Sequence, residues 1–213
     1  MTRGRFITFE GTEGSGKSTQ IRLLERHLRS AGFDVDVTRE PGGTPMGEAI
    51  RQLLFSDAGA QSDARTIALL HTAARAEHIA KRIAPALDRG VHVLCDRFMD
   101  STLAYQGGGS GLPIDQLLSL QTFAVGDCEP DLRILIAIDV ETGLGRRLEG
   151  SGDVNWVDRA GLEFHRRVQQ VYLDRARAYP SQWLVVDGDQ PVASLSEEIS
   201  AGLRVRLPVF SLL

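Results

Sequence analysis

The sequence predicts an α/β fold, a doubly wound parallel sheet of about five strands with helices on both faces. Three observations support this prediction. A glycine-rich loop lies between a short apolar run and a segment of helical period near the start of the chain. Short apolar runs and longer helical segments then alternate to the C-terminus. The connections between them have ordinary lengths, so we expect the 213 residues to form a single domain, residues 1–213.

The composition is that of an ordinary globular protein, with 42% hydrophobic and 24% charged residues. The net charge of −4 predicts no general attraction to nucleic acid or anionic membranes, so a phosphate site needs locally placed arginines. No apolar run approaches the length of a membrane span, and the first predicted strand leaves no room for a signal peptide. Cys95 and Cys128 lack metal-binding spacing and are interpreted as buried free thiols in a reducing cytoplasm.

The first element is a phosphate-binding loop. Residues 11–18 read GTEGSGKS and fit the P-loop pattern G-x-x-x-x-G-K-[ST], between a predicted strand at 5–9 and a predicted helix at 17–31. Glycines let backbone N–H groups turn toward a phosphate, and the helix N-terminus adds its positive dipole end. Lys17, expected at a solvent-facing loop end, can reach the β- and γ-phosphates, and the Ser18 hydroxyl can bind Mg²⁺. A glycine-rich turn with a chance lysine is disfavoured, because pattern and context agree. The loop predicts binding of a nucleoside triphosphate.

A second strand follows, where valine and aspartate alternate at residues 34–37. It ends in the loop 38–43, and Arg39 in this loop lies at the carboxyl edge of the sheet, where open α/β sheets bind ligands. Arg39 could there meet a second phosphate, and a solvated surface arginine is an equal alternative.

The next segment is helical. Thr44 caps a helix over residues 45–54, residues 55–61 are a predicted loop, and Ser62 caps a long helix that ends near Pro85. His71 and Arg75 lie one turn apart on this long helix and share a face. Without further evidence, we expect His71 to be a half-buried structural histidine and Arg75 to be a solvated arginine.

The nearly all-apolar run 91–95 predicts a buried parallel strand. Asp96 and Arg97 follow it directly, at the ligand edge. An aspartate there can hold Mg²⁺ or its waters, and Arg97 adds a guanidinium beside Arg39. Two arginines without a companion lysine indicate bidentate recognition of a phosphate or carboxylate.

The second half of the chain continues the alternation. We expect a short helix over residues 98–106, a mobile or tightly turned loop at 107–111, a helix beginning at Pro113 and a fourth strand over 132–138. A short helix then carries Arg146 and Arg147, residues 149–157 are polar, and Asp158 and Arg159 begin the next helix. The segment of about 146–159 is a candidate lid over the triphosphate, with an ordinary exposed connection as the alternative. A fifth strand at 183–187 and a helix over 192–205 complete the chain.

Four sequence stretches carry a resemblance to a known family: FEG before the P-loop, TREPGGT at residues 38–44, DRF at 96–98 and STLAYQG at 101–107. With these, the chain resembles bacterial thymidylate kinase from residue 6 nearly to the C-terminus. The resemblance implies a P-loop nucleoside monophosphate kinase that transfers the γ-phosphate of ATP to dTMP, giving dTDP, with Mg²⁺. It also implies a homodimer formed through helices.

The resemblance assigns residue roles. Arg39 and Arg97 would grip the dTMP phosphate, Arg75 would read thymine O4, Tyr105 would crowd the 2′ position of the sugar, and Glu13 would hold the 3′-hydroxyl. The residues expected to bind ATP are Gly11, Thr12, Glu13, Gly14, Ser15, Gly16, Lys17, Ser18 and Thr19. Those expected to bind dTMP are Glu13, Arg39, His71, Arg75, Arg97, Ser101, Thr102, Tyr105 and Gln106. Ser18 and Asp96 are expected to bind the metal, and the residues expected to act in catalysis are Lys17, Arg39, Arg97, Arg146, Arg147 and Arg159. The acceptor is an ionised phosphate, so no catalytic base is expected.

Three features depart from the family pattern. His71 stands where a phenylalanine usually stacks on thymine, Ser110 stands where an arginine is frequent, and neither the P-loop nor the lid is rich in arginine. An imidazole stacks less well on an apolar base than a phenyl ring does. Ordinary titration of His71 predicts a pH dependence of dTMP binding between about 5.5 and 7.5.

Three alternative functions are weighed against this reading. Another P-loop nucleotide or deoxynucleoside kinase is the nearest, although a nucleoside kinase needs a base near its acceptor hydroxyl. A GTPase switch would carry an N-K-x-D-like guanine-reading motif, which the sequence lacks. A catalytically weakened nucleotide-binding paralogue is the third alternative, suggested by the sparse lid.

Overall fold

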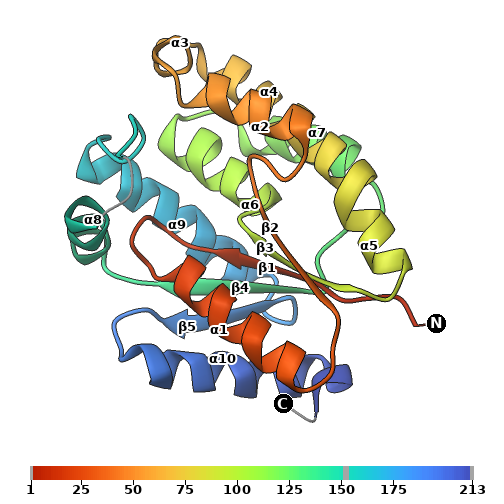
Figure 1. Cartoon of the computed structure of the whole chain (residues 1–213). Helices are drawn as coiled ribbons and strands as arrows, with labels where there is room; N and C mark the ends of the chain where they lie inside the picture. Colours follow the sequence, from red (N-terminus) through yellow and green to blue (C-terminus); the bar gives the residue numbers. More distant parts are fainter. Residues whose placement is uncertain (1, 151–153, 212–213) are drawn as a thin grey trace.

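The computed structural model describes residues 2–150 and 154–211. A five-stranded sheet in the order β2-β3-β1-β4-β5 lies at its centre, and every neighbouring pair of strands is parallel (Figure 1). The strands are β1 Phe6–Glu10, β2 Val35–Arg39, β3 His92–Asp96, β4 Leu132–Ala137 and β5 Trp183–Asp187. This confirms the predicted doubly wound parallel sheet of five strands.

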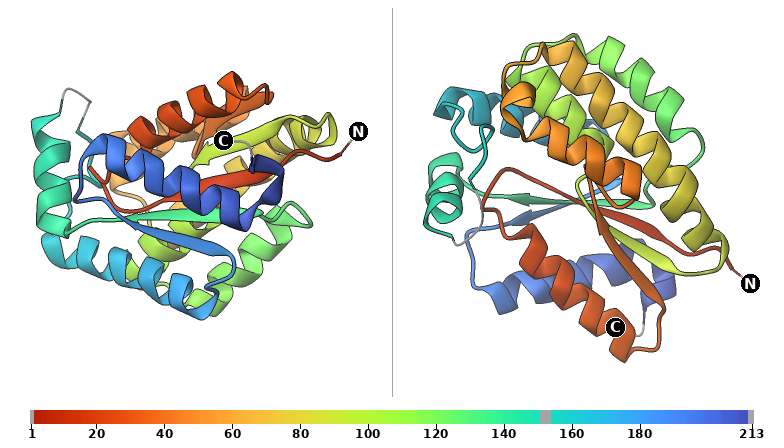
Figure 2. Two further views of the ribbon diagram at one scale, coloured as in Figure 1. Left: turned by 90° about the horizontal axis from the view of Figure 1, so that it is seen from below. Right: turned by 45° about the horizontal axis from the view of Figure 1, so that its top comes forward.

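Helices cover both faces of the sheet. Figure 1 shows two helices below it, α1 Lys17–Ser30 and α10 Val192–Arg206, and Figure 2 shows the same division from other directions. The opposite face carries α4 Ala64–His78, α5 Ala84–Asp88, α6 Met99–Thr102, α7 Ile114–Val125 and α9 Leu162–Ala178, with α2 Pro45–Leu54 packed on α4. The remaining elements are the π-helices η1 Ile79–Ile83 and η2 Leu103–Gly109, the short helices α3 Asp57–Ala60 and α8 Val140–Glu149, and the 3₁₀ turn η3 Pro208–Phe210.

The core follows from the alternation of side chains along the buried strands. Ile7 and Phe9 of β1 point to the face covered by α1 and α10, whereas Phe6 points to the other face, where it meets Phe98 edge-on. All five residues of β1 are buried, the polar Thr8 and Glu10 included, because helices cover both faces of this parallel sheet. Within the described residues, no helix is long and apolar enough to cross a membrane.

Several predicted boundaries are corrected. The expected loop at 55–61 contains the one-turn helix α3, which Ser56 caps by accepting the Gly59 N–H. Asp63, and not Ser62, caps α4, because its carboxylate accepts the Arg65 N–H. The long helix predicted to end near Pro85 is interrupted by the π-helix η1 directly before that proline, which has no N–H to donate.

The helix predicted to begin at Asp158 begins at Leu162. The Asp158 carboxylate instead accepts hydrogen bonds from Arg147 and from the Asn155 N–H, so it closes a turn before the helix.

The glycine run at 107–111 is not a mobile loop. Residues 107–109 belong to the π-helix η2, which packs closely on α9. A Cβ at Gly108 would lie 2.7 Å from the Arg167 carbonyl oxygen, and one at Gly109 would lie 2.4 Å from the Phe164 ring. Arg167 also donates hydrogen bonds to the carbonyls of Gly108 and Gly109. Gly108 and Gly109 are thus needed for the close approach of η2 to α9, whereas Gly111, with φ 78°, provides the turn that follows.

Gly108→Ala should therefore destabilise the fold by about 1–3 kcal/mol, because the new methyl group would overlap the backbone of α9. Gly145→Ala in α8 is the matched control, since nothing lies within 4 Å of its Cβ position. Thermal unfolding of the two variants measures the difference. Equal melting temperatures would contradict the close packing of η2 on α9.

Candidate active site

A pocket of about 290 Å³ lies at the carboxyl ends of the strands. Loops after β1, β2 and β3 contribute to it, together with residues of α4, η2 and the segment after α8. The predicted site residues that line it are Glu13, Gly14, Lys17, Ser18, Arg39, His71, Arg75, Asp96, Arg97, Ser101, Thr102, Tyr105, Gln106 and Arg147. The fold thus gathers all nine predicted dTMP residues and four of the nine predicted ATP residues around one pocket; Gly11, Thr12, Ser15, Gly16 and Thr19 do not line it.

The P-loop is shaped by glycines with positive φ. Gly11, Gly14 and Gly16 have φ values of 138°, 68° and 95°, which side chains rarely tolerate. A Cβ at Gly14 would also lie 1.9 Å from the Gly143 carbonyl oxygen, so the loop packs directly on α8. The two fixed glycines of the pattern, Gly11 and Gly16, and the additional Gly14 therefore stand where a side chain would strain or move the backbone.

Lys17 is buried, which corrects the expectation of a solvent-facing side chain. Its Nζ donates hydrogen bonds to the carbonyls of Gly11 (3.0 Å) and Thr12 (2.8 Å) and to the Ser15 hydroxyl (3.2 Å). Burial, and the neighbouring Arg97 charge, lower the pKa of Lys17 to about 8. The loop thus holds its own lysine in place within the site.

Ser18 and Asp96 offer oxygen atoms to a cation. The Ser18 hydroxyl donates to an Asp96 carboxylate oxygen at 3.0 Å, so α1 and the end of β3 meet at this point. No cluster of three or more His, Cys, Asp or Glu side chains with metal-binding geometry occurs among the residues that the structure describes. Mg²⁺ is commonly held by one or two protein oxygens together with phosphates and water, and this hydroxyl–carboxylate pair fits that donor set.

Arg97 lies at the centre of the pocket in a strained backbone conformation, with φ 70°. Its guanidinium donates to the Gly11 carbonyl (3.0 Å), the Tyr172 hydroxyl (3.3 Å) and the Glu13 carboxylate (2.9 Å). It also lies 4.8 Å from the ring centroid of Tyr105. One arginine after β3 therefore contacts the P-loop, η2 and α9.

Glu13 joins the same cluster. It accepts the Tyr105 hydroxyl at 2.5 Å, and its second oxygen lies 3.2 Å from Nδ1 of the fully buried His165. Burial alone would raise the pKa of Glu13, but the Arg97 charge and the His165, Lys17 and Tyr105 contacts outweigh it and hold the pKa well below its usual value. Glu13 is therefore a carboxylate throughout the neutral range.

Sequence reasoning missed His165, although a signal was present. Val168 and Tyr172 were placed on the buried side of the last long helix, and position 165 precedes them by three and seven residues, which puts it on the same face. The pattern shows burial at this position but not the contact with Glu13, which lies far away in sequence.

Arg75 is buried, contrary to the solvated arginine that the residues alone favoured. It donates to Glu40 (2.7 Å) and Thr102 (3.1 Å) and to the side-chain oxygen of Gln121. Glu40 accepts from His78 as well. Glu40 was not predicted, because a carboxylate in a loop gives no sign of the buried arginine that it will meet.

His71 is half-buried and lines the pocket, so it is placed where the resemblance expects a base-stacking residue. Burial, followed by the charges of Arg75, Arg97 and Arg51, lowers its pKa from 6.5 to about 3. The pH dependence predicted between 5.5 and 7.5 from ordinary titration is therefore wrong, because the imidazole is neutral over that whole range.

Arg39 reaches the pocket but is paired, with its guanidinium 2.9 Å from a Glu48 carboxylate oxygen. Arg51, which sequence reasoning missed, lines the same side; it donates to the Pro41 carbonyl and lies 4.8 Å from the Phe55 ring centroid. With Arg75, Arg97 and Arg147, five guanidinium groups thus border the pocket.

The three lid arginines do not lie together. Arg147 lines the pocket and pairs with Asp158 at 3.0 Å. Arg146 lies outside the pocket and pairs with Asp189 after β5, and Arg159 is exposed. Trp156 donates its indole N–H to the Leu54 carbonyl at 3.0 Å, so this segment reaches the end of α2 across the pocket. Residues 151–153 of the predicted lid lie outside the described residues.

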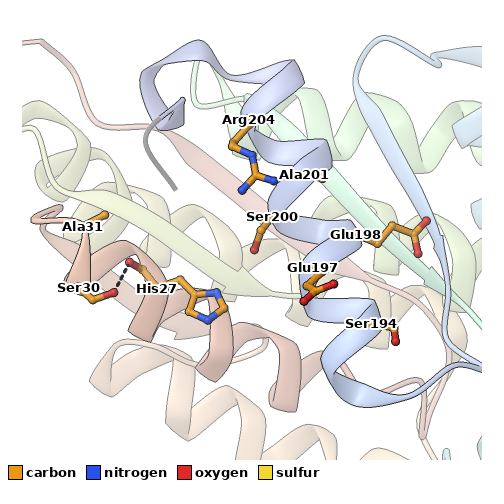
Figure 3. A pocket seen from close by; sticks show the side chains of 9 residues that line it. All are labelled: His27, Ser30, Ala31, Ser194, Glu197, Glu198, Ser200, Ala201 and Arg204. Atoms are coloured by element: carbon orange, nitrogen blue, oxygen red, sulfur yellow. Dashed lines mark hydrogen bonds between the residues drawn. The ribbon is translucent and has the colours of Figure 1, made fainter.

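A larger groove of about 890 Å³ lies elsewhere, between α1 and α10 (Figure 3). Its lining is polar and of mixed charge, and it contains no predicted site residue. The lining residues are His27, Ser30, Ala31, Ser194, Glu197, Glu198, Ser200, Ala201 and Arg204. Of these two pockets, only the smaller one is lined by the P-loop, the strand-end loops and the predicted arginines.

Comparisons with known proteins agree with this geometry. The sequence matches the family model described as thymidylate kinase over residues 9–199. It is 51% identical to a thymidylate kinase from Thermomicrobium roseum, over 92% of this chain and 92% of that protein. It is 46% identical to one from Caulobacter vibrioides, over 94% and 96% of the two chains.

A solved structure shows the same likeness. The crystal structure of thymidylate kinase from Ehrlichia chaffeensis matches 95% of this chain and 99% of its own, with a TM-score of 0.78 and 34% sequence identity. The P-loop, the arginine after β3 and the buried arginine of α4 therefore stand in a framework shared across the full length of these proteins. This chain belongs to the thymidylate kinase family.

Proposed function

We propose that this protein is a dTMP kinase, which transfers the γ-phosphate of ATP to dTMP and releases dTDP and ADP. One observation carries the proposal beyond family membership. The P-loop lysine and Arg97 both donate to the same carbonyl, that of Gly11, each at 3.0 Å. A cation suited to the donor phosphates and a guanidinium suited to an acceptor phosphate are thus held side by side.

The chemistry needs charge neutralisation more than proton removal. The nucleophile is an oxygen of the dTMP phosphate, which is ionised at neutral pH, so no general base is required. The residues must hold two anions in line and offset their repulsion. Lys17, Arg39, Arg51, Arg97 and Arg147 line the pocket and are available for this work, besides Arg75, which Glu40 pairs. Mg²⁺ held by Ser18, Asp96 and the ATP phosphates would add charge neutralisation at the transferring phosphoryl group.

Recognition of the acceptor follows from the pocket walls. Arg75 is fixed by Glu40, Thr102 and Gln121, so its orientation toward a base carbonyl is set before ligand binds. Tyr105 is fixed against Glu13 and stacks with Arg97, which supports its role in crowding the sugar 2′ position. Ser101, Thr102 and Gln106 complete the polar wall of the acceptor site.

We further propose that the protein acts as a homodimer in the cytoplasm. Large exposed apolar side chains on the packed helices α2, α4 and α7 support a partner surface: Met46, Leu53, Leu69 and Phe123 are 58%, 46%, 53% and 89% exposed. Cys95 and Cys128 are both free and buried, which supports a reducing compartment.

The proposed activity is tested by ADP release with ATP and a panel of acceptors, namely dTMP, dUMP, UMP, dCMP and thymidine. We expect dTMP to have the highest kcat/KM, dUMP to exceed UMP because of Tyr105, and thymidine to be inert because it lacks the phosphate that Arg97 grips. Preferential use of thymidine would favour a nucleoside kinase. ATP binding without turnover on any acceptor would favour a nucleotide-binding paralogue.

Lys17→Ala should lower kcat by a hundredfold or more, about 3 kcal/mol, because a charged contact to the transferring phosphate is lost. The matched control is Lys81→Ala, because Lys81 is exposed on η1 away from the pocket. Steady-state kinetics and thermal unfolding are measured for both variants. A Lys17→Ala enzyme that keeps near-wild-type kcat would contradict the phosphate-binding role of the loop.

His71→Phe should lower the KM for dTMP by several-fold, since a phenyl ring stacks better on an apolar base. The pH profile of that KM between 5.5 and 7.5 should keep its shape, because the imidazole is neutral there. A variant with wild-type dTMP kinetics would show that His71 does not meet the base.

The His71→Phe substitution should also change how the thermal stability depends on pH. The unfolded chain protonates His71 below about pH 6.5, whereas the folded chain does so only near 3, so the stability conferred by the neutral imidazole is lost as pH falls below 6.5. The fall in Tm from pH 7 to pH 5 should therefore be smaller in His71→Phe than in wild type. His27→Gln, at an exposed histidine of α1, should leave that fall unchanged.

A further inference from the structure

We propose that Glu10 is a positioning residue for Arg97: its buried carboxylate holds the turn between β3 and α6 in the conformation that directs the Arg97 guanidinium into the acceptor pocket. The inference rests on the proposed function, in which Arg97 binds the acceptor phosphate. Glu10 is the last residue of β1 and lies immediately before the P-loop.

The two oxygens of Glu10 hold both sides of this turn. Oε1 accepts the Phe98 N–H at 2.8 Å, and Oε2 accepts the Ser101 hydroxyl at 2.7 Å. Phe98 directly follows Arg97, and Ser101 lies in α6. One carboxylate thus fixes the backbone after Arg97 and the helix that follows it.

This fixing matters because the Arg97 backbone is strained. Its φ of 70° lies in the left-handed region, which costs free energy for a residue with a side chain and persists only where the surroundings hold it. The Arg97 N–H donates to the Phe9 carbonyl at 2.9 Å, and the next N–H, of Phe98, donates to Glu10. Two consecutive N–H groups are therefore tied to two consecutive residues of β1.

Hydroxyl groups extend the contact to the guanidinium itself. The Ser101 hydroxyl, which donates to Glu10, lies 2.7 Å from the Tyr172 hydroxyl, and Tyr172 in turn accepts from Arg97 Nη1 at 3.3 Å. Glu10 thus reaches both the backbone and the side chain of Arg97 without touching the pocket, whose lining does not include it.

Burial of a carboxyl group at this position is costly for the fold. Glu10 is fully buried, and none of the ion pairs formed among the described residues includes it. Burial, followed by the charge of Asp100, raises the pKa of Glu10 to about 7, whereas the Ser101 hydrogen bond, the Arg97 charge and the Phe98 N–H lower it. The groups that favour the carboxylate are thus Arg97 itself and two residues of the turn that follows it.

The experiment compares wild type, Glu10→Gln, Tyr172→Phe and Asp131→Asn in steady-state assays with ATP and dTMP, together with thermal unfolding. Glutamine keeps one acceptor for Phe98 but presents an amide N–H₂ to Ser101, so the Ser101 hydroxyl can no longer donate to residue 10 and must accept there instead. Asp131→Asn is the matched control: its carboxylate accepts the Phe6 N–H at 2.7 Å at the opposite end of the same strand, far from Arg97 in the register.

We expect Glu10→Gln to raise the KM for dTMP by about tenfold while the KM for ATP changes by less than about twofold. Tyr172→Phe should shift the KM for dTMP in the same direction by several-fold. Asp131→Asn should alter Tm and leave both KM values at wild-type levels.

An unchanged KM for dTMP in Glu10→Gln, or an equal rise in both KM values, would overturn the positioning role. If Glu10→Gln does not fold, Tyr172→Phe carries the test, and an unchanged KM for dTMP in that variant overturns the inference. A wild-type protein that releases no ADP with dTMP would instead refute the proposed function, so the two failures are distinguishable.

Discussion

The ion pair between Arg97 and Glu13 is the interaction on which the arrangement of the site depends. It joins the P-loop after β1 to the turn after β3, two segments 84 residues apart in sequence, at 2.9 Å. Because β1 and β3 are parallel neighbours, both segments leave the sheet at the same edge. The pair ties the P-loop directly to the arginine that borders the acceptor side of the pocket. Tyr105 and His165 then pack around the carboxylate and connect η2 and α9 to the same point.

Asp100 and Glu40, two other buried carboxylates near the site, are also paired with cations, because an unpaired buried charge is costly. Asp100 binds Arg133 of β4 and Arg175 of α9, and Glu40 binds Arg75 and His78 of α4. Asp100 thus connects α6 to β4 and α9, and Glu40 connects the loop after β2 to α4. The pocket side chains are therefore fixed before any ligand arrives, which is what a reaction between two anions requires, because reorganising charged groups in the transition state would cost free energy. The proposed kinase chemistry thus relies on cations that are oriented by carboxylates, and these carboxylates are fixed in turn by further hydrogen bonds.

Much of this could be predicted from the sequence, because the P-loop, the strand ends and Asp96–Arg97 are encoded by neighbouring residues with fixed geometry. The sheet was predicted from the alternation of strands and helices. The P-loop, Arg39, Asp96 and Arg97 were placed at its carboxyl edge, whereas the site residues on α4, α6 and η2 were predicted from the family resemblance. The rest depends on contacts between distant segments. Glu10, Glu40 and His165 carry no local pattern that identifies their partners. The glycines at 107–109 suggested mobility, but close packing on α9 decides their conformation. Lys17 was expected in solvent because the pattern defines its reach toward phosphate and not its bonds to the loop carbonyls.

A double-mutant cycle on dTMP affinity measures whether the Arg97–Glu13 ion pair couples the donor and acceptor sides. Isothermal titration of dTMP into wild type, Glu13→Ala, Arg97→Ala and the double variant gives the coupling free energy between the two side chains. We expect the double variant to lose little more affinity than Arg97→Ala alone, which corresponds to a coupling of about 1 kcal/mol or more. Additive losses, with a coupling near zero, would show that the two residues act independently and that the ion pair does not unite the two sides.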